Sequence, residues 1–110
     1  MKIRIISLEL ASFLDEFRKA GRDEKRKMAA KPRFHLRDKV HRAYYAAMVE
    51  SLCLESRLKI PTWVNDRRCF LHDPAFAGGL ESLKAVLLVE SPLPFRRRNI
   101  FVSENALSRA

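Results

Sequence analysis

Cys69, His72 and Asp73 are the residues whose types and spacing could do chemistry, because they lie within five positions of one another. A cysteine nucleophile needs a thiolate that is activated by a base, and a third group must orient that base. The three residue types are present, but so short a stretch predicts no reliable triad. A zinc site usually shows two close ligand pairs, and Cys69-x2-His72 is a single pair. We therefore expect no catalytic triad, no metal and no cofactor.

Arg67 and His72 offer a second chemistry. An arginine can stabilise the charge of a phosphodiester under attack, and a histidine can move the proton of a 2′-hydroxyl. The spacing Arg67-x4-His72 resembles the motif of HEPN-type ribonucleases, which are small all-helical proteins that commonly act as dimers. The resemblance implies a helix at this place, whereas Asp73-Pro74 predicts a loop, and a structural or surface role for His72 stays open. A ribonuclease that uses Arg67 and His72 is therefore an alternative reading.

A helix over 36–58 is the element that must position the rest of the chain, since this stretch holds neither Gly nor Pro. One face of it is apolar at a 3.6-residue period. That face consists of Leu36, Val40, Ala43, Tyr44, Ala47, Leu54 and Leu58. A second apolar surface, made of Tyr45, Met48, Val49 and Leu52, predicts neighbours on more than one side. The charged residues Lys39, Arg42, Glu50 and Arg57 are expected to stay in water.

Two more helices are expected, over 3–20 and 80–90, from apolar residues at steps of three and four. Gly21 is placed to end the first of them in a left-handed conformation, and a short leading strand at Ile3 stays open. Trp63, the only tryptophan, is expected to fold back as a lid on the core. The loop over 64–79 should be packed and could hold a helical turn at 74–77.

These elements predict an all-α fold in a single domain over 1–110. Three main helices form a small bundle, and the C-terminal segment wraps irregularly across them. No apolar run approaches the ~20 residues of a membrane span, and the N-terminus shows no signal peptide. We therefore expect a cytoplasmic protein in which Cys53 and Cys69 are reduced.

The net charge of +9 is concentrated at the N-terminal end. Residues 22–34 are expected to form a solvated basic linker, or a frayed extension of the first helix that ends near Pro32. An alternative is a nucleic-acid-binding module that contacts phosphates only, since no aromatic residue interleaves these charges to stack on bases. The residues that would carry this contact are Lys25, Arg26, Lys27, Lys31 and Arg33.

The sequence SPLPFRRRNIFVSENALSRA, over 91–110, resembles the ending of a family of small bacterial proteins. Pro61-x-Trp63 and Asp73-Pro74-x-Phe76 resemble the connecting region of the same family. Its members are similar to antitoxin or accessory components that are encoded beside nucleotidyltransferase-like toxins. Some of them carry an N-terminal helix-turn-helix domain, for which residues 1–34 offer too little. The resemblance implies a non-enzymatic protein that binds and masks a toxin-like enzyme.

The contact with such a partner is expected in the segment after Pro94. Arginines between apolar anchors suit an interface with an acidic or phosphate-bearing partner. The expected partner-binding residues are Phe95, Arg96, Arg97, Arg98, Asn99 and Phe101. An arginine that caps the preceding helix or pairs with Glu90 in the same chain is the alternative, and a homo-oligomer also stays open.

Overall fold

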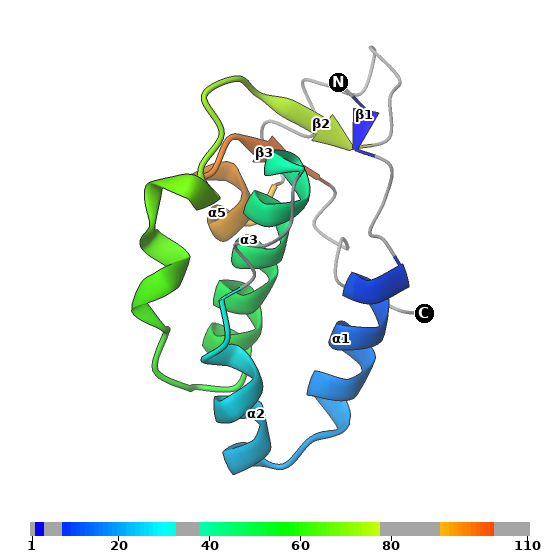
Figure 1. Cartoon of the computed structure of the whole chain (residues 1–110), viewed down its shortest axis with the longest axis vertical. Helices are drawn as coiled ribbons and strands as arrows, with labels where there is room; N and C mark the ends of the chain where they lie inside the picture. Colours follow the sequence, from blue (N-terminus) through cyan, green and yellow to red (C-terminus); the bar gives the residue numbers. More distant parts are fainter. Residues whose placement is uncertain (1, 4–7, 33–37, 78–90, 103–110) are drawn as a thin grey trace.

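The structure, a computed structural model, describes residues 2–3, 8–32, 38–77 and 91–102. It is mostly helical, with three main helices, α1 (Leu8–Lys19), α2 (Arg22–Ala29) and α3 (Lys39–Glu55) (Figure 1). The predicted helical class is thereby confirmed. The helix expected over 80–90 lies outside the described residues. None of the described helices is long and apolar enough to cross a membrane.

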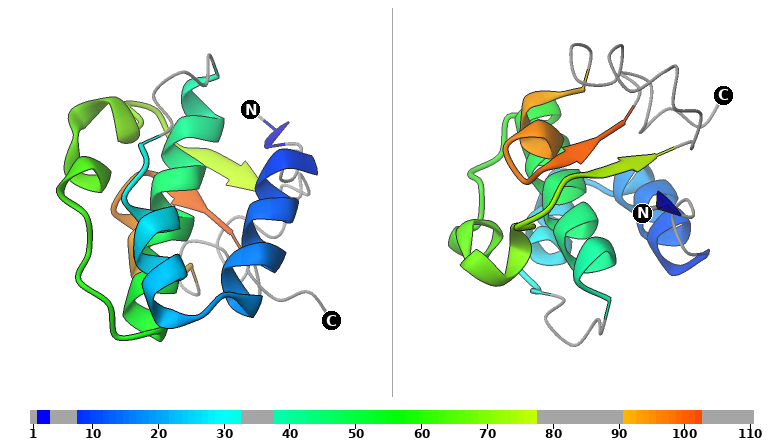
Figure 2. Two further views of the ribbon diagram at one scale, coloured as in Figure 1. Left: turned by 60° about the horizontal axis from the view of Figure 1, so that its bottom comes forward. Right: turned by 90° about the horizontal axis from the view of Figure 1, so that it is seen from above.

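Helix α3 is the centre of the molecule. Asp38 caps its start, because the Asp38 Oδ1 atom accepts hydrogen bonds from the backbone N–H of Val40 at 2.8 Å and of His41 at 3.3 Å. Every residue from 43 to 50 is buried, so this part of the helix is covered on all sides. Helix α1 lies on one side of it and the segment over 62–69 on the other (Figure 2). The predicted central position with several neighbours is confirmed.

Two side chains of α3 differ from the sequence-based prediction. Leu54, expected in the core, is 56% exposed, because it lies in the last turn of the helix beyond the fully covered stretch. Glu50, expected in water, is buried at 7% exposure. Its carboxylate is paired inside the protein with Arg97 and Arg98, in the site described below.

The C-terminal end of α3 is a Schellman motif. The backbone N–H of Leu58 donates to the carbonyl of Cys53 at 2.8 Å, and that of Arg57 donates to the carbonyl of Leu54 at 3.3 Å. This closure puts Arg57 in the left-handed region, with φ 55°. The helix therefore ends at Glu55, three residues before the predicted end, and Leu58 folds back into the core.

Helix α2 occupies most of the stretch that was expected to be a basic linker. Gly21 precedes it with φ −73°, which is an extended and not a left-handed conformation, so the glycine starts α2 where the sequence predicted only an end. The Arg22 side chain donates to the carbonyls of Ser56 at 3.2 Å and Arg57 at 2.9 Å. A cation is favourable at this negative end of the α3 dipole. Residues 22–29 therefore form a separate helix, which is neither a linker nor an extension of the first helix, and Ala29, at 2% exposure, anchors it in the core.

Helix α1 contributes buried aromatic and aliphatic residues at helical spacing, namely Phe13, Leu14 and Phe17. The Phe13 ring meets the Tyr45 ring edge-on, with 5.1 Å between centroids. The helix begins at Leu8, five residues later than predicted. Before it, Lys2–Ile3 form the short strand β1, so the leading strand that the sequence left open is present.

A small parallel sheet joins three distant segments in the order β1-β2-β3. Its other strands are β2 (Ala75–Ala77) and β3 (Ile100–Phe101). The register pairs Lys2 with Phe76 and Ala75 with Ile100. The helical turn expected at 74–77 is therefore wrong. Strand β2 pairs with β1 and β3, which are both distant in the sequence. The local pattern of residues 74–77 carries no information about these two partner strands.

Two short 3₁₀ helices, η1 (Thr62–Asn65) and η2 (Arg67–Cys69), follow α3. Trp63 stacks on the Tyr45 ring with 5.6 Å between centroids and an interplanar angle of 18°. Its indole Nε1 donates to the carbonyl of Ala29 at 2.8 Å. The prediction that Trp63 closes the core as a lid is confirmed.

Candidate functional site

The C-terminal segment over 91–102 is a closed loop. The buried Ser91 hydroxyl donates to the carbonyl of Val102 at 2.9 Å and accepts from its N–H at 2.8 Å, so one side chain ties the two ends together. Between them lies the one-turn helix α5 (Leu93–Arg96), which begins after Pro92. The loop is thus a compact unit that packs on α3.

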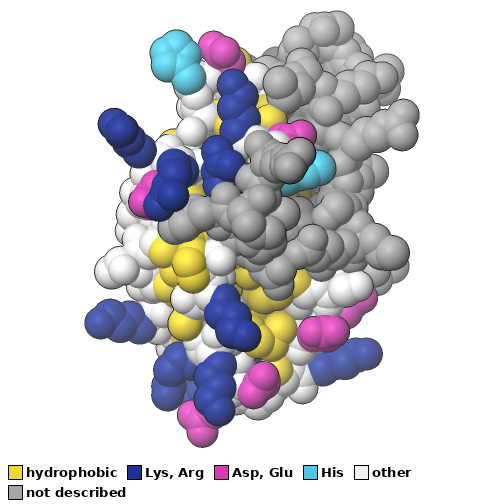
Figure 3. All heavy atoms as spheres, in the orientation of Figure 1, with side chains coloured by type: hydrophobic (Ala, Val, Ile, Leu, Met, Phe, Trp, Pro, Cys, Tyr) yellow, Lys and Arg dark blue, Asp and Glu magenta, His cyan; other side chains and the backbone are white. Residues whose placement is uncertain are grey.

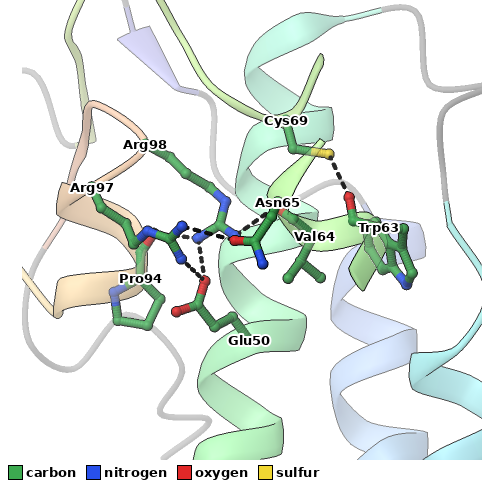
Figure 4. Close-up of polar contacts among 8 residues, drawn as sticks. All are labelled: Glu50, Trp63, Val64, Asn65, Cys69, Pro94, Arg97 and Arg98. Atoms are coloured by element: carbon green, nitrogen blue, oxygen red, sulfur yellow. Dashed lines mark hydrogen bonds and ion pairs between the residues drawn. The ribbon is translucent and has the colours of Figure 1, made fainter. Parts of the chain in front are cut away.

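Arg98 holds this loop to the rest of the protein from inside, with 0% exposure. Its Nη1 atom lies 2.7 Å from the Glu50 Oε1 atom and donates to the carbonyl of Pro94 at 2.7 Å. Its Nη2 atom donates to the carbonyl of Val64 at 2.7 Å (Figure 4). The Arg98 Nε atom has no hydrogen-bond partner among the described residues. One guanidinium therefore connects α3, η1 and α5.

Arg97 contacts the same carboxylate oxygen from the solvent side. Its Nη1 atom lies 2.7 Å from the Glu50 Oε1 atom, and its Nη2 atom donates to the Asn65 side-chain oxygen at 2.8 Å. The Arg97 side chain is 35% exposed. Both guanidiniums also lie over the Phe70 ring, at 5.2 Å for Arg97 and 4.9 Å for Arg98. We call Glu50, Arg97 and Arg98 the arginine cluster.

The arginine cluster carries one net positive charge in the interior, since two guanidiniums share one carboxylate. Burial lowers the pKa of Arg98, and the hydrogen bond and charge of Glu50 raise it. An arginine stays protonated in proteins, so the cluster is a fixed charge arrangement that holds elements together. Such an arrangement positions the backbone of the elements that it joins.

Asn99 completes the attachment of the loop. It adopts φ 67°, a left-handed conformation that asparagine tolerates better than most residues. Its side-chain amide donates to the carbonyls of His72 at 3.1 Å and Leu71 at 3.3 Å. Its own carbonyl accepts the N–H of Ala75 at 2.9 Å, which brings the loop beside β2.

The expected partner-binding residues therefore divide into two groups. Phe95 and Phe101 are buried at 0% and 7% exposure, and Arg97, Arg98 and Asn99 make the internal contacts above. Arg96 and Arg97 are both exposed, but of the polar residues among the six only Arg96 makes no side-chain hydrogen bond or ion pair with another described residue. The pairing with Glu90 that the sequence left open is not tested, because Glu90 lies outside the described residues; the acid that Arg97 and Arg98 contact is Glu50. A role in partner binding stays a prediction.

The expected chemical residues of the loop over 67–73 do not converge on a site. Cys69, the last residue of η2, is buried with its Sγ atom 3.8 Å from the carbonyl of Trp63, and burial raises the pKa of its thiol. The His72 side chain is 96% exposed, 3.3 Å from the Asp73 carboxylate, and Arg67 is exposed on η2. Within the described ranges, no group of three potential metal ligands occurs. Both cysteines are free.

The residues of the nucleic-acid-binding alternative lie on or after α2. Lys25 is half-buried over the Phe17 ring at 5.7 Å, and Arg26 lies 3.5 Å from the Asp23 carboxylate. Lys27 and Lys31 are exposed, and Arg33 lies outside the described residues. Acidic side chains interrupt the basic ones over the lower part of the face that Figure 3 shows. The basic surface is therefore broken up, and the alternative stays a prediction.

Sequence reasoning missed Glu50, Asn65 and Leu93. Glu50 had a readable signal, since it is the only charged residue between Ala43 and Leu54. A lone charge in an apolar run of a central helix needs a buried partner or a break in the packing. Leu93 is 62% exposed on α5, and nothing in its local pattern indicates this.

None of the protein-family models, curated proteins or solved structures compared with the chain matches it. The function therefore has to be argued from the geometry of the chain itself.

Proposed function

We propose that this chain is a non-enzymatic interaction protein of antitoxin type, which binds and masks a toxin-like enzyme through helix α5. One observation supports the proposal above the others. Leu93 is 62% exposed, and Arg96 is exposed three residues later on the same turn. Residues three apart lie on one face of a helix. An apolar side chain and a guanidinium are thus presented together to a partner.

The turn that carries these two side chains is rigidly mounted. Phe95 is fully buried and meets the Tyr44 ring edge-on, with 5.0 Å between centroids. Arg98 and the Ser91 hydroxyl fix the backbone on either side. A surface that is ordered before binding loses less conformational entropy on binding, and this raises affinity. The buried residues of the loop would thus hold the contact, while Leu93 and Arg96 make it.

The chemistry of the turn indicates what the partner presents. Interface centres are enriched in aromatic residues, methionine and arginine and depleted in lysine. Leu93 would enter an apolar pocket, and Arg96 would meet a carboxylate or phosphate beside that pocket. The net charge of +9 would speed encounter with an acidic surface. From the resemblance of the C-terminal segment, we propose that the partner is a nucleotidyltransferase-like toxin. We also propose that the protein acts in the cytoplasm.

The experiment compares a contact variant with a matched control. The contact variant is Leu93→Ser with Arg96→Glu, and the control is Leu54→Ser with Arg67→Glu, which alters a similarly exposed leucine and an exposed arginine elsewhere. The tagged chain is used to isolate a stoichiometric protein partner from its host, and calorimetry then measures the affinity for the purified partner. We expect the contact variant to bind at least about tenfold more weakly and the control to bind as the parent does.

Masking is tested in the same material. The activity of the purified partner should fall when the parent chain is added and should stay unchanged with the contact variant. Equal weakening by the two variants would refute α5 as the contact. A chain that is folded and isolates only nucleic acid, or that cleaves RNA and loses this activity in His72→Ala, would instead favour one of the two alternatives.

A further inference from the structure

A hollow of about 380 Å³ lies between the C-terminal half of α2 and the segment over 58–62. We call it the Leu58 groove. Its volume is at the low end of the roughly 300–1,000 Å³ typical of ligand sites, and it is open along one side. The lining residues are Arg26, Ala29, Ala30, Leu58, Lys59, Ile60, Pro61 and Thr62.

The floor of the Leu58 groove is apolar and held in place. Leu58 is 7% exposed and is folded back by the Schellman motif of α3. Ala29 is 2% exposed, and its carbonyl accepts the indole N–H of Trp63. This hydrogen bond fixes α2 against the segment after α3. The hollow therefore exists before anything binds.

Two cations, Arg26 and Lys59, line the Leu58 groove, and both are exposed. The Arg26 side chain is 61% exposed and pairs with Asp23, which is 90% exposed, at 3.5 Å, so their attraction is weak in water. Figure 3 shows apolar side chains among both basic and acidic ones on the lower part of the molecule, and the residues that line the Leu58 groove include two cations and no acid. Apolar surface edged with positive charge complements a ligand that is apolar and acidic.

We propose that the Leu58 groove is a second protein-binding site, which takes a peptide segment of a partner with a large apolar side chain between acidic residues. The apolar side chain lies on the floor of the groove, and the acidic residues meet Arg26 and Lys59. The groove does not include Leu93 or Arg96. The proposal is thus separate from the α5 contact.

The lining favours a peptide over a nucleic acid. Single-stranded nucleic acid binds through aromatic side chains that stack on bases, and the residues of the groove wall are aliphatic or polar. The neighbouring hollow, which contains Arg18 and Arg22, is a weaker anion site. Its Arg22 donates to the carbonyls of Ser56 and Arg57, just after the end of α3, and Arg18 lies 3.7 Å from Glu55. Those two cations already compensate negative groups of the protein.

The test uses a fluorescein-labelled peptide of about ten residues with one central leucine between glutamates, and it follows binding by fluorescence anisotropy. The groove variant is Arg26→Glu with Lys59→Glu. The control is Lys27→Glu with Lys31→Glu, which gives the same change in net charge on exposed residues outside the groove. We expect saturable binding by the parent chain, at least about tenfold weaker binding by the groove variant, and a change below about threefold in the control.

Variants of the peptide test whether the groove recognises both the apolar side chain and the acidic residues. Replacing the central leucine of the peptide by serine, or its glutamates by glutamine, should each weaken binding about tenfold. Equal weakening by the groove and control variants would overturn the proposal, since a general charge effect would explain both. Binding that is absent up to about 1 mM peptide, or tighter for a single-stranded DNA of equal length, would overturn it as well. The Leu93→Ser and Arg96→Glu changes should leave peptide affinity unchanged.

Discussion

Replacement of Glu50 by glutamine removes the one carboxylate that Arg97 and Arg98 share in the interior. Glutamine keeps nearly the same volume and an oxygen acceptor, so the change is almost purely electrostatic. Arg98, with 0% exposure, would keep its hydrogen bonds to the carbonyls of Pro94 and Val64. It would lose its counter-charge and could not reach water.

The expected loss follows from this burial. Breaking a buried pair by removing one partner costs about 3–5 kcal/mol, which is a large part of the roughly 5–15 kcal/mol by which domains are stable. Arg97 provides the contrast, because its side chain is 35% exposed. Arg97→Gln leaves Glu50 paired with the buried Arg98, so it should cost only about 0.5–1.5 kcal/mol.

Urea unfolding, followed by the fluorescence of Trp63, measures both variants. Trp63 is the only tryptophan, and it is stacked on Tyr45 at 5.6 Å, so its emission reports the loss of the core. With a slope of about 2 kcal/mol per molar urea, Glu50→Gln should lower the midpoint by about 2 M. Circular dichroism under native conditions shows whether the variant still folds.

A loss below about 1 kcal/mol in Glu50→Gln, or a loss no larger than that of Arg97→Gln, would refute the reasoning. The apolar pair Glu50→Leu with Arg98→Met offers a second check. Buried ion pairs can often be replaced by packed apolar residues without loss, so the double variant should be more stable than Glu50→Leu alone. If it is not, the cluster is held by something other than its charges.

The remaining predictions concern two backbone positions and one acid. Arg57→Gly should raise the free energy of unfolding by about 0.5–1 kcal/mol, because φ 55° strains a residue with a Cβ atom. Asn99→Gly, at φ 67°, should lower the free energy of unfolding, because the hydrogen bonds to the carbonyls of residues 71 and 72 are lost. Urea unfolding checks that the two glycine variants change the free energy of unfolding in opposite directions. Hydrogen bonds from Arg68 lower the pKa of Asp66 from 3.8 to about 2. The Asp66 contribution to stability is therefore complete above pH 4 and lost as the pH falls toward 2, so an acid titration of unfolding should be flatter there in Asp66→Asn than in the parent.

The sequence alone predicts the structure correctly where the periodicity of apolar residues or the type of a single residue determines which elements form and which side chains are buried. The apolar residues around 36–58 recur so often that only a helix with several neighbours can bury them, and α3 is that helix. Trp63 after Pro61 is too large and apolar to leave in water, and it covers the core. The basic stretch after Gly21 is predicted to be a solvated linker or an extension of the first helix, and it forms the separate helix α2.

The tertiary structure alone decided the role of the arginines in the C-terminal segment. Three adjacent arginines look alike in the sequence, yet Arg98 is fully buried, Arg97 is half-exposed and Arg96 faces solvent. The difference arises from Glu50, which lies 47 residues from Arg97 in the sequence. A charge enters the interior only when a partner of opposite sign is already there. Local periodicity reports which face of a segment is apolar, but it carries no information on which distant group will meet that face, and only the folded chain supplies that.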